Sequence, residues 1–487
     1  MVVLYIFLLA GFVAGKNPGP IAAQNPVSVA GQQKMLNVRD FGARGDGKTD
    51  DAAAINHALT TARFESKSVY FPAGIYLCNT ADKEGHILNF QADDVHGIGL
   101  YGDSNTTRIT TDRNTGSTLL YTWAYAKSDG LTIKNIFFEN THPLIPHATQ
   151  GVFLQGTKGE NFSNVTVTGC RFEGFSNALG GQGIKGLTIS MNVFGSPRGH
   201  DNAKNDNEPA VFIWLYDNHN GYCQDIRITG NTADGYTGNG PVSALTTKRA
   251  MDGFVYGTGY HFTITGNTTR NFSEEHYALA PKATLPDDTS GVLISNNHLD
   301  ASIPTGSTDD NGKKHMSNYG IRCDISNAVI SGNEIRNYTY GILVRGVEYP
   351  NATLHTYQIS GNKLYAAGDT TNYDVRTAIL IQGNVNLPAK DVQVTGNEIH
   401  INTLKNFKVS DGIVLYDLTK GVVQDNTLIS DQRYTSTQAV AISYGRVREV
   451  LEKSNRVVGM KFRKMLSKTD SVQIITEDGG PTTKNPK

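Results

Sequence analysis

Four carboxylates in the middle of the chain could together cleave a glycosidic bond: Glu208, Asp252, Glu275 and Asp324. Hydrolysis of such a bond uses two carboxyl groups about 5 to 9.5 Å apart, one donating a proton and the other acting as nucleophile or base. Solvated carboxylates are common in turns, and no spacing motif marks two of these four as a pair. The sequence therefore predicts the reacting groups without selecting among them.

The segment 274–277 and nearby cations suit a different reaction, β-elimination on a polymer of uronic acids. This reaction needs a base near C5 of the sugar and cations that neutralise its carboxylate. Glu275, His276 and Tyr277 stand together in the segment, and the predicted cations are Lys248, Lys282 and Arg322. A lone histidine is weak evidence, because it is often an ordinary turn residue. Both reactions stay open at this point.

Two groups of site residues follow. The predicted catalytic residues are Glu208, Asp252, Glu275, His276, Lys282, Arg322 and Asp324. The predicted substrate-binding residues are Trp214, Lys248, Tyr277, Arg345 and Tyr416. The rings of Trp214 and Tyr416 could stack on sugar faces, although they could equally pack beneath a long loop. No metal or other cofactor is predicted, because calcium would need converging carboxylates and the Asp pairs at 287–288 and 309–310 are expected to be loop residues.

A repeat must position these residues. Ile-Ser-Gly-Asn and close relatives of it recur along the chain, for example at residues 228–231, 264–267, 330–333 and 359–362. Copies lie roughly 20 to 40 residues apart, the range of solenoids and related arrays. Gly and Asn tolerate positive φ, so a strand is expected to bend there, and a short apolar strand precedes many copies. Stacked coils of this kind predict an all-β fold, a single-stranded right-handed parallel β-helix.

The repeat also aligns neighbouring coils. Side chains alternate along a strand, so Ile321 and Cys323 should face the core while Arg322 and Asp324 face outward. The same alignment predicts one exposed ridge formed by Gln155, Trp214, Lys248, Lys282, Arg322, Arg345, Gln382 and Tyr416. The longest segments between strands leave the same coils, and loops on a rigid scaffold commonly hold a site. We therefore expect a groove across residues 196–345.

Composition and the chain ends limit the partners. The net charge of −1 over 487 residues suggests no nucleic-acid partner, and the four cysteines form no Cys-x-x-Cys pair, so we expect them to be buried core residues. Residues 2–15 are apolar but too short for a confident membrane span, and they are either a secretory signal or an anchor that packs into a larger assembly. The predicted parts are residues 1–35 (anchor or signal, with linker), 36–445 (β-helix) and 446–487 (cap and flexible tail).

The segment NVRDFGARGDGKTDDAAAINHAL, followed by VYFPAGIYL, covers residues 37–77. It predicts a short capping helix that shields the open end of the solenoid. This segment resembles the opening of the pectate-lyase-like superfamily of right-handed β-helices, which includes polysaccharide lyases, glycoside hydrolases, epimerases and bacteriophage tailspike depolymerases. The resemblance implies that Asp46, Asp50 and Asp51 serve turns and the cap, not catalysis.

The resemblance is closest in kind to the tailspike depolymerases. It implies a homotrimer in the virion tail, joined to other tail proteins through residues 1–35, that degrades a bacterial capsular, lipopolysaccharide or exopolysaccharide glycan. One alternative is a secreted, extracellular polysaccharide lyase, glycoside hydrolase or uronate epimerase of a microbe. Another is a non-catalytic spike that only binds glycans.

Overall fold

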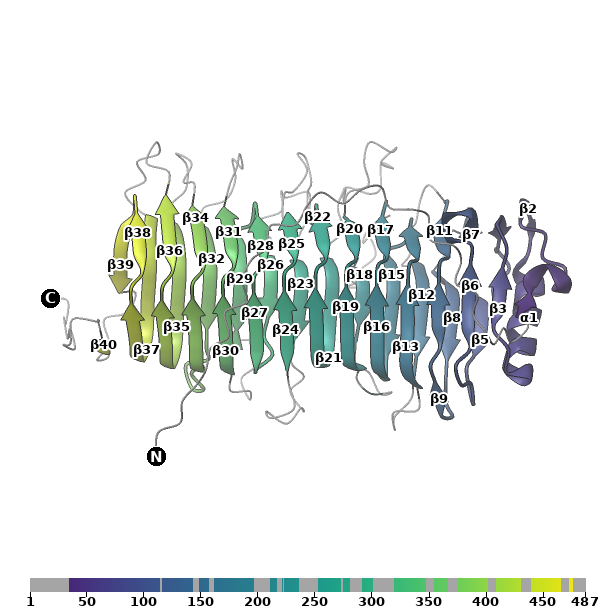
Figure 1. The fold of residues 1–487 in the computed structure, drawn as a ribbon, viewed down its shortest axis with the longest axis horizontal. Helices are drawn as coiled ribbons and strands as arrows, with labels where there is room; N and C mark the ends of the chain where they lie inside the picture. The colour runs from purple at the N-terminus through teal and green to yellow at the C-terminus, as the bar shows by residue number, and fades with distance from the viewer. Residues whose placement is uncertain are drawn as a thin grey trace, which may run out of the picture. The chain divides into compact units, whose positions relative to one another are not determined.

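The chain divides into two units, residues 1–34 and 35–487. The computed structural model describes residues 35–113, 116–142, 149–156, 162–196, 211–216, 221, 223–235, 253–272, 275–280, 291–300, 319–346, 354–366, 375–401, 409–430, 439–465 and 473–475. All of these residues lie in the second unit, which is a stack of coils whose strands pair in parallel with the strands of the next coil (Figure 1). The predicted right-handed parallel β-helix is confirmed.

Each coil has two limbs that belong to one continuous 26-stranded sheet, because β21, β35 and β37 run through both limbs. The strands of the first limb are β5 (His86–Gln91), β8 (Ser117–Trp123), β12 (Thr149–Gln155), β15 (Asn177–Gln182), β18 (Val211–Leu215), the start of β21 (Gly253–Thr265), β23 (Glu275–Ala280), β26 (Tyr319–Cys323), β29 (Tyr340–Arg345), β32 (Val375–Gln382), the starts of β35 (Val409–Gln424) and β37 (Ala439–Lys453), and β39 (Lys461–Met465).

The second limb carries the strands that precede the Gly-Asn bends. They are β1 (Leu36–Asn37), β3 (Val69–Phe71), β6 (Gly99–Gly102), β9 (Ser128–Asp129), β10 (Thr132–Lys134), β13 (Phe162–Thr168), β16 (Ile184–Ser190), β19 (Cys223–Thr229), the end of β21, β24 (Val292–Ser295), β27 (Ala328–Ser331), β30 (His355–Ser360), β33 (Lys390–Thr395), the ends of β35 and β37, and β40 (Gln473–Ile475).

After the bend the chain enters a separate 14-stranded sheet. Its strands are β2 (Asp46–Asp50), β4 (Gly74–Leu77), β7 (Thr107–Thr111), β11 (Phe137–Asn140), β14 (Arg171–Glu173), β17 (Val193–Gly195), β20 (Thr232–Asp234), β22 (Thr268–Arg270), β25 (His298–Asp300), β28 (Glu334–Arg336), β31 (Lys363–Ala366), β34 (Glu398–Ile401), β36 (Thr427–Ser430) and β38 (Arg456–Val458). Short strands on three sides of each coil thus enclose one long core.

The bend itself differs from the sequence-based expectation. Only the residue at the Gly position adopts positive φ, as at Gly266 and Gly332, where φ is 65°. The Asn side chain instead turns into the core and forms a ladder along the solenoid. Asn267 shows the pattern: its Oδ1 accepts from the backbone and side-chain nitrogens of Asn231, while its Nδ2 donates to Asn297 Oδ1. A polar side chain is tolerated in the core because its hydrogen bonds are satisfied.

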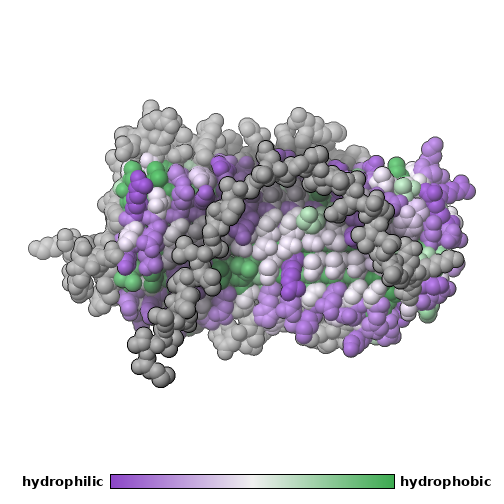
Figure 2. Space-filling model, viewed as in Figure 1, coloured by the Kyte–Doolittle hydropathy of each residue, from purple (hydrophilic) through white to green (hydrophobic). Residues whose placement is uncertain are grey.

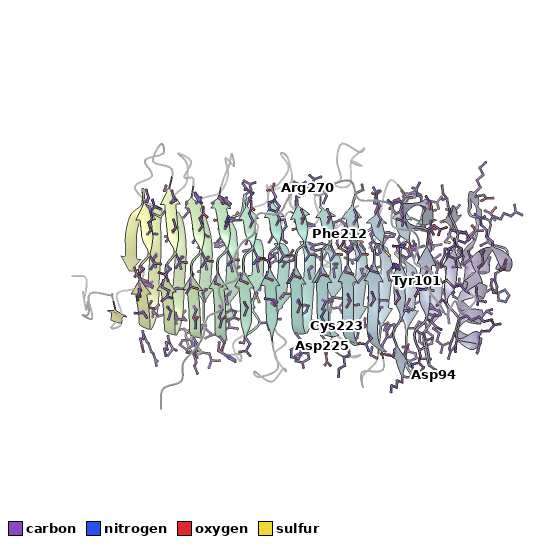
Figure 3. The ribbon with its side chains drawn as sticks, in the orientation of Figure 1. Asp94, Tyr101, Phe212, Cys223, Asp225 and Arg270 are labelled. Atoms are coloured by element: carbon purple, nitrogen blue, oxygen red, sulfur yellow. The ribbon has the colours of Figure 1, made fainter. Side chains whose placement is uncertain are left out.

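The core is apolar and contains the cysteines, as predicted. Cys78, Cys170, Cys223 and Cys323 are all buried and unbridged. Figure 3 shows Phe212 and Cys223 between the two edges of the coils, whereas Asp94 and Asp225 lie nearer one edge. Both aspartates have positive φ, of 59° in a turn at Asp94 and of 52° inside β19 at Asp225, a conformation that short polar side chains tolerate.

The second limb presents a flat surface to solvent. One column of its outward side chains consists of small hydroxyl residues: Thr168, Ser190, Thr229, Thr265, Ser295, Ser331, Ser360 and Thr395. Figure 2 shows this side of the unit as a pale band of intermediate hydropathy, bordered by hydrophilic residues at the coil turns. A second outward column of the same limb carries larger exposed side chains, among them Arg227, Leu293 and Gln358.

The N-terminal end is closed by α1 (Ala52–Glu65), preceded by the 3-10 helix η1 (Val38–Phe41); a second 3-10 turn, η2 (Ser104–Thr106), precedes β7. The inward residues of α1, including Ile55 and Leu59, are fully buried. Asp46 accepts from the Lys48 and Thr49 amides, Asp50 from the Ala52 amide, and Asp51 from those of Arg44 and Gly45. These bonds give the three aspartates structural roles, in agreement with the sequence-based interpretation.

The C-terminal boundary differs from the predicted one. Strand β37 runs across position 445 and pairs with β35 along both limbs, and β39 and β40 pair with β37 in turn. The solenoid therefore continues beyond residue 445. Residues 1–34 of the predicted anchor or signal segment (1–35) and the end of the predicted tail, residues 476–487, lie outside the described residues.

Candidate functional site

The outer face of the first limb carries three columns of outward side chains. In β5 they start at His86, Asn89 and Gln91, and in β8 these positions pair with Thr118, Tyr121 and Trp123. In β12 they continue as Gln150, Phe153 and Gln155. Since neighbouring strands lie about 4.8 Å apart, each column places one side chain per coil in a line parallel to the solenoid axis.

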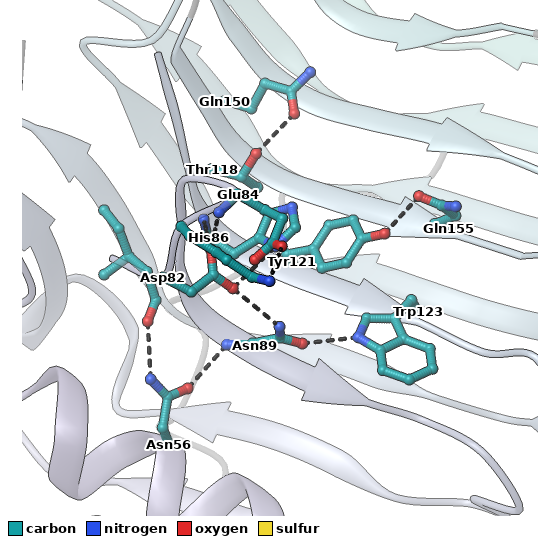
Figure 4. A network of polar contacts seen from close by, with 12 residues as sticks. Asn56, Asp82, Glu84, His86, Asn89, Thr118, Tyr121, Trp123, Gln150 and Gln155 are labelled. Carbon is teal, nitrogen blue, oxygen red and sulfur yellow. Dashed lines mark hydrogen bonds and ion pairs between the residues drawn. The ribbon is translucent and has the colours of Figure 1, made fainter. Parts of the chain in front are cut away.

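The N-terminal part of this face combines aromatic rings with amides, and we call residues His86, Asn89, Gln91, Tyr121, Trp123, Phe153 and Gln155 the aromatic-amide surface. The rings of His86 and Tyr121 stack with centroids 3.8 Å apart, and Tyr121 is 6.0 Å from Phe153. Figure 4 shows how hydrogen bonds fix these side chains. The Tyr121 hydroxyl donates to Gln155 Oε1 at 2.6 Å, and Trp123 Nε1 donates to Asn89 Oδ1 at 2.8 Å.

The protonation state of Tyr121 suits hydrogen bonding. Burial raises the pKa of Tyr121 to about 12, so the phenol stays neutral near pH 7 and keeps its donor proton. Rings with an apolar face and polar edge, beside amides that both donate and accept, are suited to ligands that carry hydroxyl groups on an otherwise apolar frame. Sugars are ligands of this kind.

A cluster of charges lies farther along the same face, on β23 and β26. Arg322 Nε is 2.8 Å from Asp324 Oδ2, and Arg322 Nη1 is 3.4 Å from Glu275 Oε1. Asp324 Oδ1 also accepts from the Arg345 backbone amide at 2.7 Å. One guanidinium therefore holds two carboxylates on neighbouring coils. We call Glu275, Arg322 and Asp324 the carboxylate cluster.

The two carboxylates of the cluster differ in exposure. The Asp324 side chain is 0% exposed, whereas those of Glu275 and Arg322 are 17% and 18% exposed. The sequence-based expectation that Asp324 faces solvent is wrong. Asp324 follows the last residue of β26, and its side chain turns under that of Arg322. The expected inward positions of Ile321 and Cys323 are confirmed.

The predicted ridge is in fact two neighbouring columns. Trp214 and Arg322 belong to the column that contains Tyr121, with Trp214 paired to Gly180 and Tyr256. Arg345 pairs with Gln382 and Gln382 with Tyr416 in the next column, two residues farther along the strand. The error of two residues keeps the ridge side chains that the structure describes on the predicted face, because side chains alternate with a period of two.

The two predicted aromatic contacts are half-buried. Trp214 packs on Tyr216 with ring centroids 4.8 Å apart, and its Nε1 finds no partner among the described residues. The guanidinium of Arg446 lies 4.4 Å over the ring of Tyr416. One face of Tyr416 is therefore already covered by a cation, while Trp214 continues the line of rings from the aromatic-amide surface.

Two predicted site residues point into the core. His276 and Tyr277 are each 0% exposed, and His276 Nδ1 lies 2.6 Å from Thr269 Oγ1. Burial lowers the pKa of His276 to about 3, so this imidazole is neutral near pH 7, and burial raises the pKa of the Tyr277 phenol well above its usual range. Contact of either side chain with a substrate is contradicted by this placement, because both fill the interior of a coil.

The remaining predicted residues, Glu208, Lys248, Asp252 and Lys282, lie outside the described residues. Apart from Gln155, the aromatic-amide surface was missed from the sequence because the coils were aligned on Gly-Asn copies that start only near residue 167. The polar residues His86, Asn89 and Gln91 among the apolar residues of HILNFQ would have indicated a strand with one exposed face. TLLYTW carries no such signal, because its buried Thr122 is polar.

Among the residues that the structure describes, no group of three or more His, Cys, Asp or Glu side chains is arranged to hold a metal ion. The Asp pairs at 287–288 and 309–310 are not among them. In the same part of the chain, no helix has the length and apolar character to cross a bilayer.

A parallel β-helix whose N-terminal end is capped by a helix is the architecture of the pectate-lyase-like solenoids. The chain belongs to the rhamnogalacturonase A/epimerase, pectate lyase-like family, whose model matches residues 35–278.

Solved structures resemble the whole described solenoid. PfbA, a surface protein and adhesin of Streptococcus pneumoniae, is 16% identical with a TM-score of 0.55, covering 88% of this chain and 99% of that one. A tailspike variant of E. coli bacteriophage HK620, solved with a hexasaccharide, is 11% identical with a TM-score of 0.51, covering 87% of this chain and 78% of that one. These similarities establish the fold.

Among curated proteins, a non-secreted LysM effector of Penicillium expansum is 26% identical over 211 residues, which cover 35% of this chain and 16% of that protein. The chain spans less than a fifth of the length of each curated relative that it matches.

Proposed function

We propose that the protein binds a polysaccharide along the outer face of the first limb and cleaves it at the carboxylate cluster. The observation that carries the proposal is the register of this limb, in which rings and amides of β5, β8 and β12 share columns with the charges of β23 and β26, while Phe153, Asn177 and Ala278 in these columns are buried. Seven strand spacings of about 4.8 Å separate β5 from β26, so the face extends over roughly 34 Å. An extended polymer parallel to the axis can contact both parts.

Hydrolysis is the reaction that the cluster supports best. Glu275 supplies one of the two carboxyl groups that the reaction needs, and it is the candidate proton donor or base towards the sugar because its side chain is partly exposed. Asp324 is buried and orients Arg322, so the second carboxyl group is proposed to be one of the other predicted carboxylates, Glu208 or Asp252. Elimination is less well supported, since Arg322 is already engaged by both carboxylates and would have to neutralise a third one on a uronic acid.

The experiment is incubation with a panel of neutral and acidic polysaccharides, in which reducing ends and the ultraviolet absorbance of unsaturated sugars are both followed. We expect reducing ends without unsaturated product. Unsaturated product would instead indicate elimination. Binding of a polysaccharide without any product would identify a glycan-binding spike, a function that the aromatic-amide surface could perform alone.

Substitution of Glu275 tests whether the carboxylate cluster carries out the cleavage. Replacing a general acid or base typically costs 10²- to 10⁴-fold in rate, so we expect Glu275→Gln to lose about that much activity. The matched control is Glu334→Gln, which removes a carboxylate that pairs with Arg336 on the 14-stranded sheet. Equal activity of the two variants would refute the assignment to Glu275.

We further propose the tailspike type of depolymerase, a homotrimer of the virion tail that acts on a bacterial surface glycan and is joined to other tail proteins through residues 1–35. The resemblance of residues 37–77 and the shared fold support this form. Light scattering that gives a monomer would contradict it. Loss of the N-terminal residues from protein produced in a secreting host, seen by mass spectrometry, would favour the secreted microbial enzyme.

A further inference from the structure

An open pocket lies where the capping helix meets the N-terminal end of the aromatic-amide surface. It has a volume of about 380 Å³, and its lining consists of Asn56, Leu59, Thr60, Arg63 and Phe64 from α1, Asn89 and Gln91 from β5, and Trp123 from β8. The five helix residues recur at three- and four-residue intervals, so they form one face of α1. We propose that this pocket is a separate sugar-binding subsite that holds an uncharged sugar residue of the polysaccharide. The subsite would anchor the polysaccharide at a distance from the carboxylate cluster, and this inference rests on the proposed function.

The helix side of the pocket is fixed to the edge strand. Asn56 Nδ2 donates to the Ile87 carbonyl at 2.9 Å, and Asn56 Oδ1 accepts from the Asn89 amide at 2.9 Å. The Asn56 amide thus pairs with the outer edge of β5 as a neighbouring strand would. Because this pairing holds α1 against the sheet, the pocket is preformed, and binding does not have to order it.

The sheet side is fixed as well. Trp123 Nε1 donates to Asn89 Oδ1 at 2.8 Å, and the Trp123 ring packs on Tyr125 with centroids 4.7 Å apart. Figure 4 shows Asn56, Asn89 and Trp123 linked in one chain of hydrogen bonds. Phe64 from the helix, 77% exposed, supplies a second ring to the pocket. A large apolar side chain exposed in a pocket beside oriented amides indicates a ligand with an apolar face and hydroxyl edges.

The charges at the pocket favour an uncharged sugar. The guanidinium of Arg63 is 3.8 Å from the Asp93 carboxylate, and Gln91 Nε2 also donates to Asp93, at 2.6 Å. Burial raises the pKa of Asp93, but hydrogen bonds from the Ala126 amide and Gln91 outweigh it, so the pKa is lowered and the carboxylate stays ionised to balance Arg63. An acidic sugar would therefore meet no uncompensated cation from this ion pair.

The distance between the pocket and the carboxylate cluster should determine the length of the oligosaccharide products. The pocket involves β5 and β8, whereas Glu275 lies on β23, five strand spacings beyond β8, which is roughly 24 Å. A chain anchored in the pocket and cleaved at the cluster would yield oligosaccharides of several sugar units. Short substrates that cannot reach both places would lose the contribution of the pocket.

The sequence offers a direct probe, because its two tryptophans are Trp123 and Trp214. In a Trp214→Phe variant, the fluorescence of Trp123 alone reports on the pocket. We expect it to change and saturate on titration with manno-, malto- or galacto-oligosaccharides, with weaker or no response to oligogalacturonates. Adding Phe64→Ala to this background should weaken the binding about two- to tenfold, the usual range for one aromatic contact. The matched control is Met191→Ala, at a side chain that is 68% exposed on a coil bend.

The outcomes separate the two proposals. Cleavage of a polysaccharide without any response of Trp123, or an unchanged affinity in the Phe64→Ala protein, would overturn the subsite and leave the proposed function standing. A preference of the pocket for acidic sugars would overturn its assignment to an uncharged residue. Neither binding nor cleavage of any glycan in the panel would overturn both proposals.

Discussion

The asparagine ladder supplies the sharpest test of how the solenoid is held together. We consider Asn267→Ala, which removes four hydrogen bonds from the core. Asn267 Oδ1 accepts from the Asn231 backbone and side-chain nitrogens, both at 2.9 Å, and Nδ2 donates to the Ile228 carbonyl at 2.9 Å and to Asn297 Oδ1 at 3.0 Å. At about 1 kcal/mol net for each buried bond, the variant should lose ~4 kcal/mol of stability.

The terminal member of the ladder is the matched control. Asn455 accepts from the Asn426 backbone and side chain at 3.0 and 2.9 Å and donates to the Val423 carbonyl at 2.8 Å, but it is only partly buried. Water can replace most of the hydrogen bonds that Asn455→Ala removes, so we expect the unfolding free energy of this variant to fall by about 1 kcal/mol. Asn267→Asp, which keeps the volume but points an oxygen at two acceptors, should be at least as unstable as Asn267→Ala.

The assay is urea unfolding followed by circular dichroism, with hydrogen exchange of the amides around residues 228–297 as a local readout. Solenoids can unfold in parts, so the local readout is needed to assign the loss to the affected coils. Equal losses for Asn267→Ala and Asn455→Ala, or a loss below 1 kcal/mol for the former, would refute the view that the ladder stabilises the stack.

Two further predictions concern buried ionisable groups. Arg322→Gln should destabilise the protein by roughly 3 kcal/mol, because it removes the ion pair that Arg322 forms with the fully buried Asp324. Urea unfolding of the variant without such a loss would show that this ion pair does not stabilise the fold. His276 has a pKa of about 3 in the fold, below its unfolded value of about 6.5, so between these values the unfolded state binds more protons and stability falls as the pH is lowered. As the pH is lowered from 6.5 to 5, we expect the unfolding free energy of the unmodified protein to fall by up to about 1.4 kcal/mol per pH unit because of His276. In His276→Phe this contribution to the pH dependence should be absent. If the pH dependence of the variant equals that of the unmodified protein, the buried imidazole takes up the proton in the folded state.

Much of the fold could be predicted from short-range patterns. The Gly-Asn copies identify the bends, because a residue with positive φ is needed at the same point of every coil, as at Gly266 and Gly332. The head segment identified the capping helix and the roles of Asp46, Asp50 and Asp51. Its periodicity of three and four residues places Ile55 and Leu59 in the core, where the structure has them.

The candidate site was predicted only in part. Glu275, Arg322 and Asp324 were identified as chemical groups, and the fold brings them together. Glu275 and Arg322 are 47 residues apart in the chain, and strand pairing brings them together. The sequence pattern could align the strands of neighbouring coils only to within two residues. The burial of His276 was missed because two successive side chains of a first-limb strand lie inside, His276 and Tyr277 in β23 as Ile87 and Leu88 in β5, which simple alternation does not anticipate.

By itself, the sequence determined the repeating coil, the faces that its strands present and the cap at its first turn, because each depends on residues that are neighbours in the chain. Only the tertiary structure decided which side chains share a column. That choice depends on the pairing of strands from neighbouring coils, such as Tyr319 with Tyr340 and Glu275 with Tyr319, and it aligns Trp123 with Gln155 and brings Glu275 to Arg322. A contact between helix and sheet likewise joins Asn56 to β5. Long-range pairing, more than local pattern, therefore sets where this protein can bind and react.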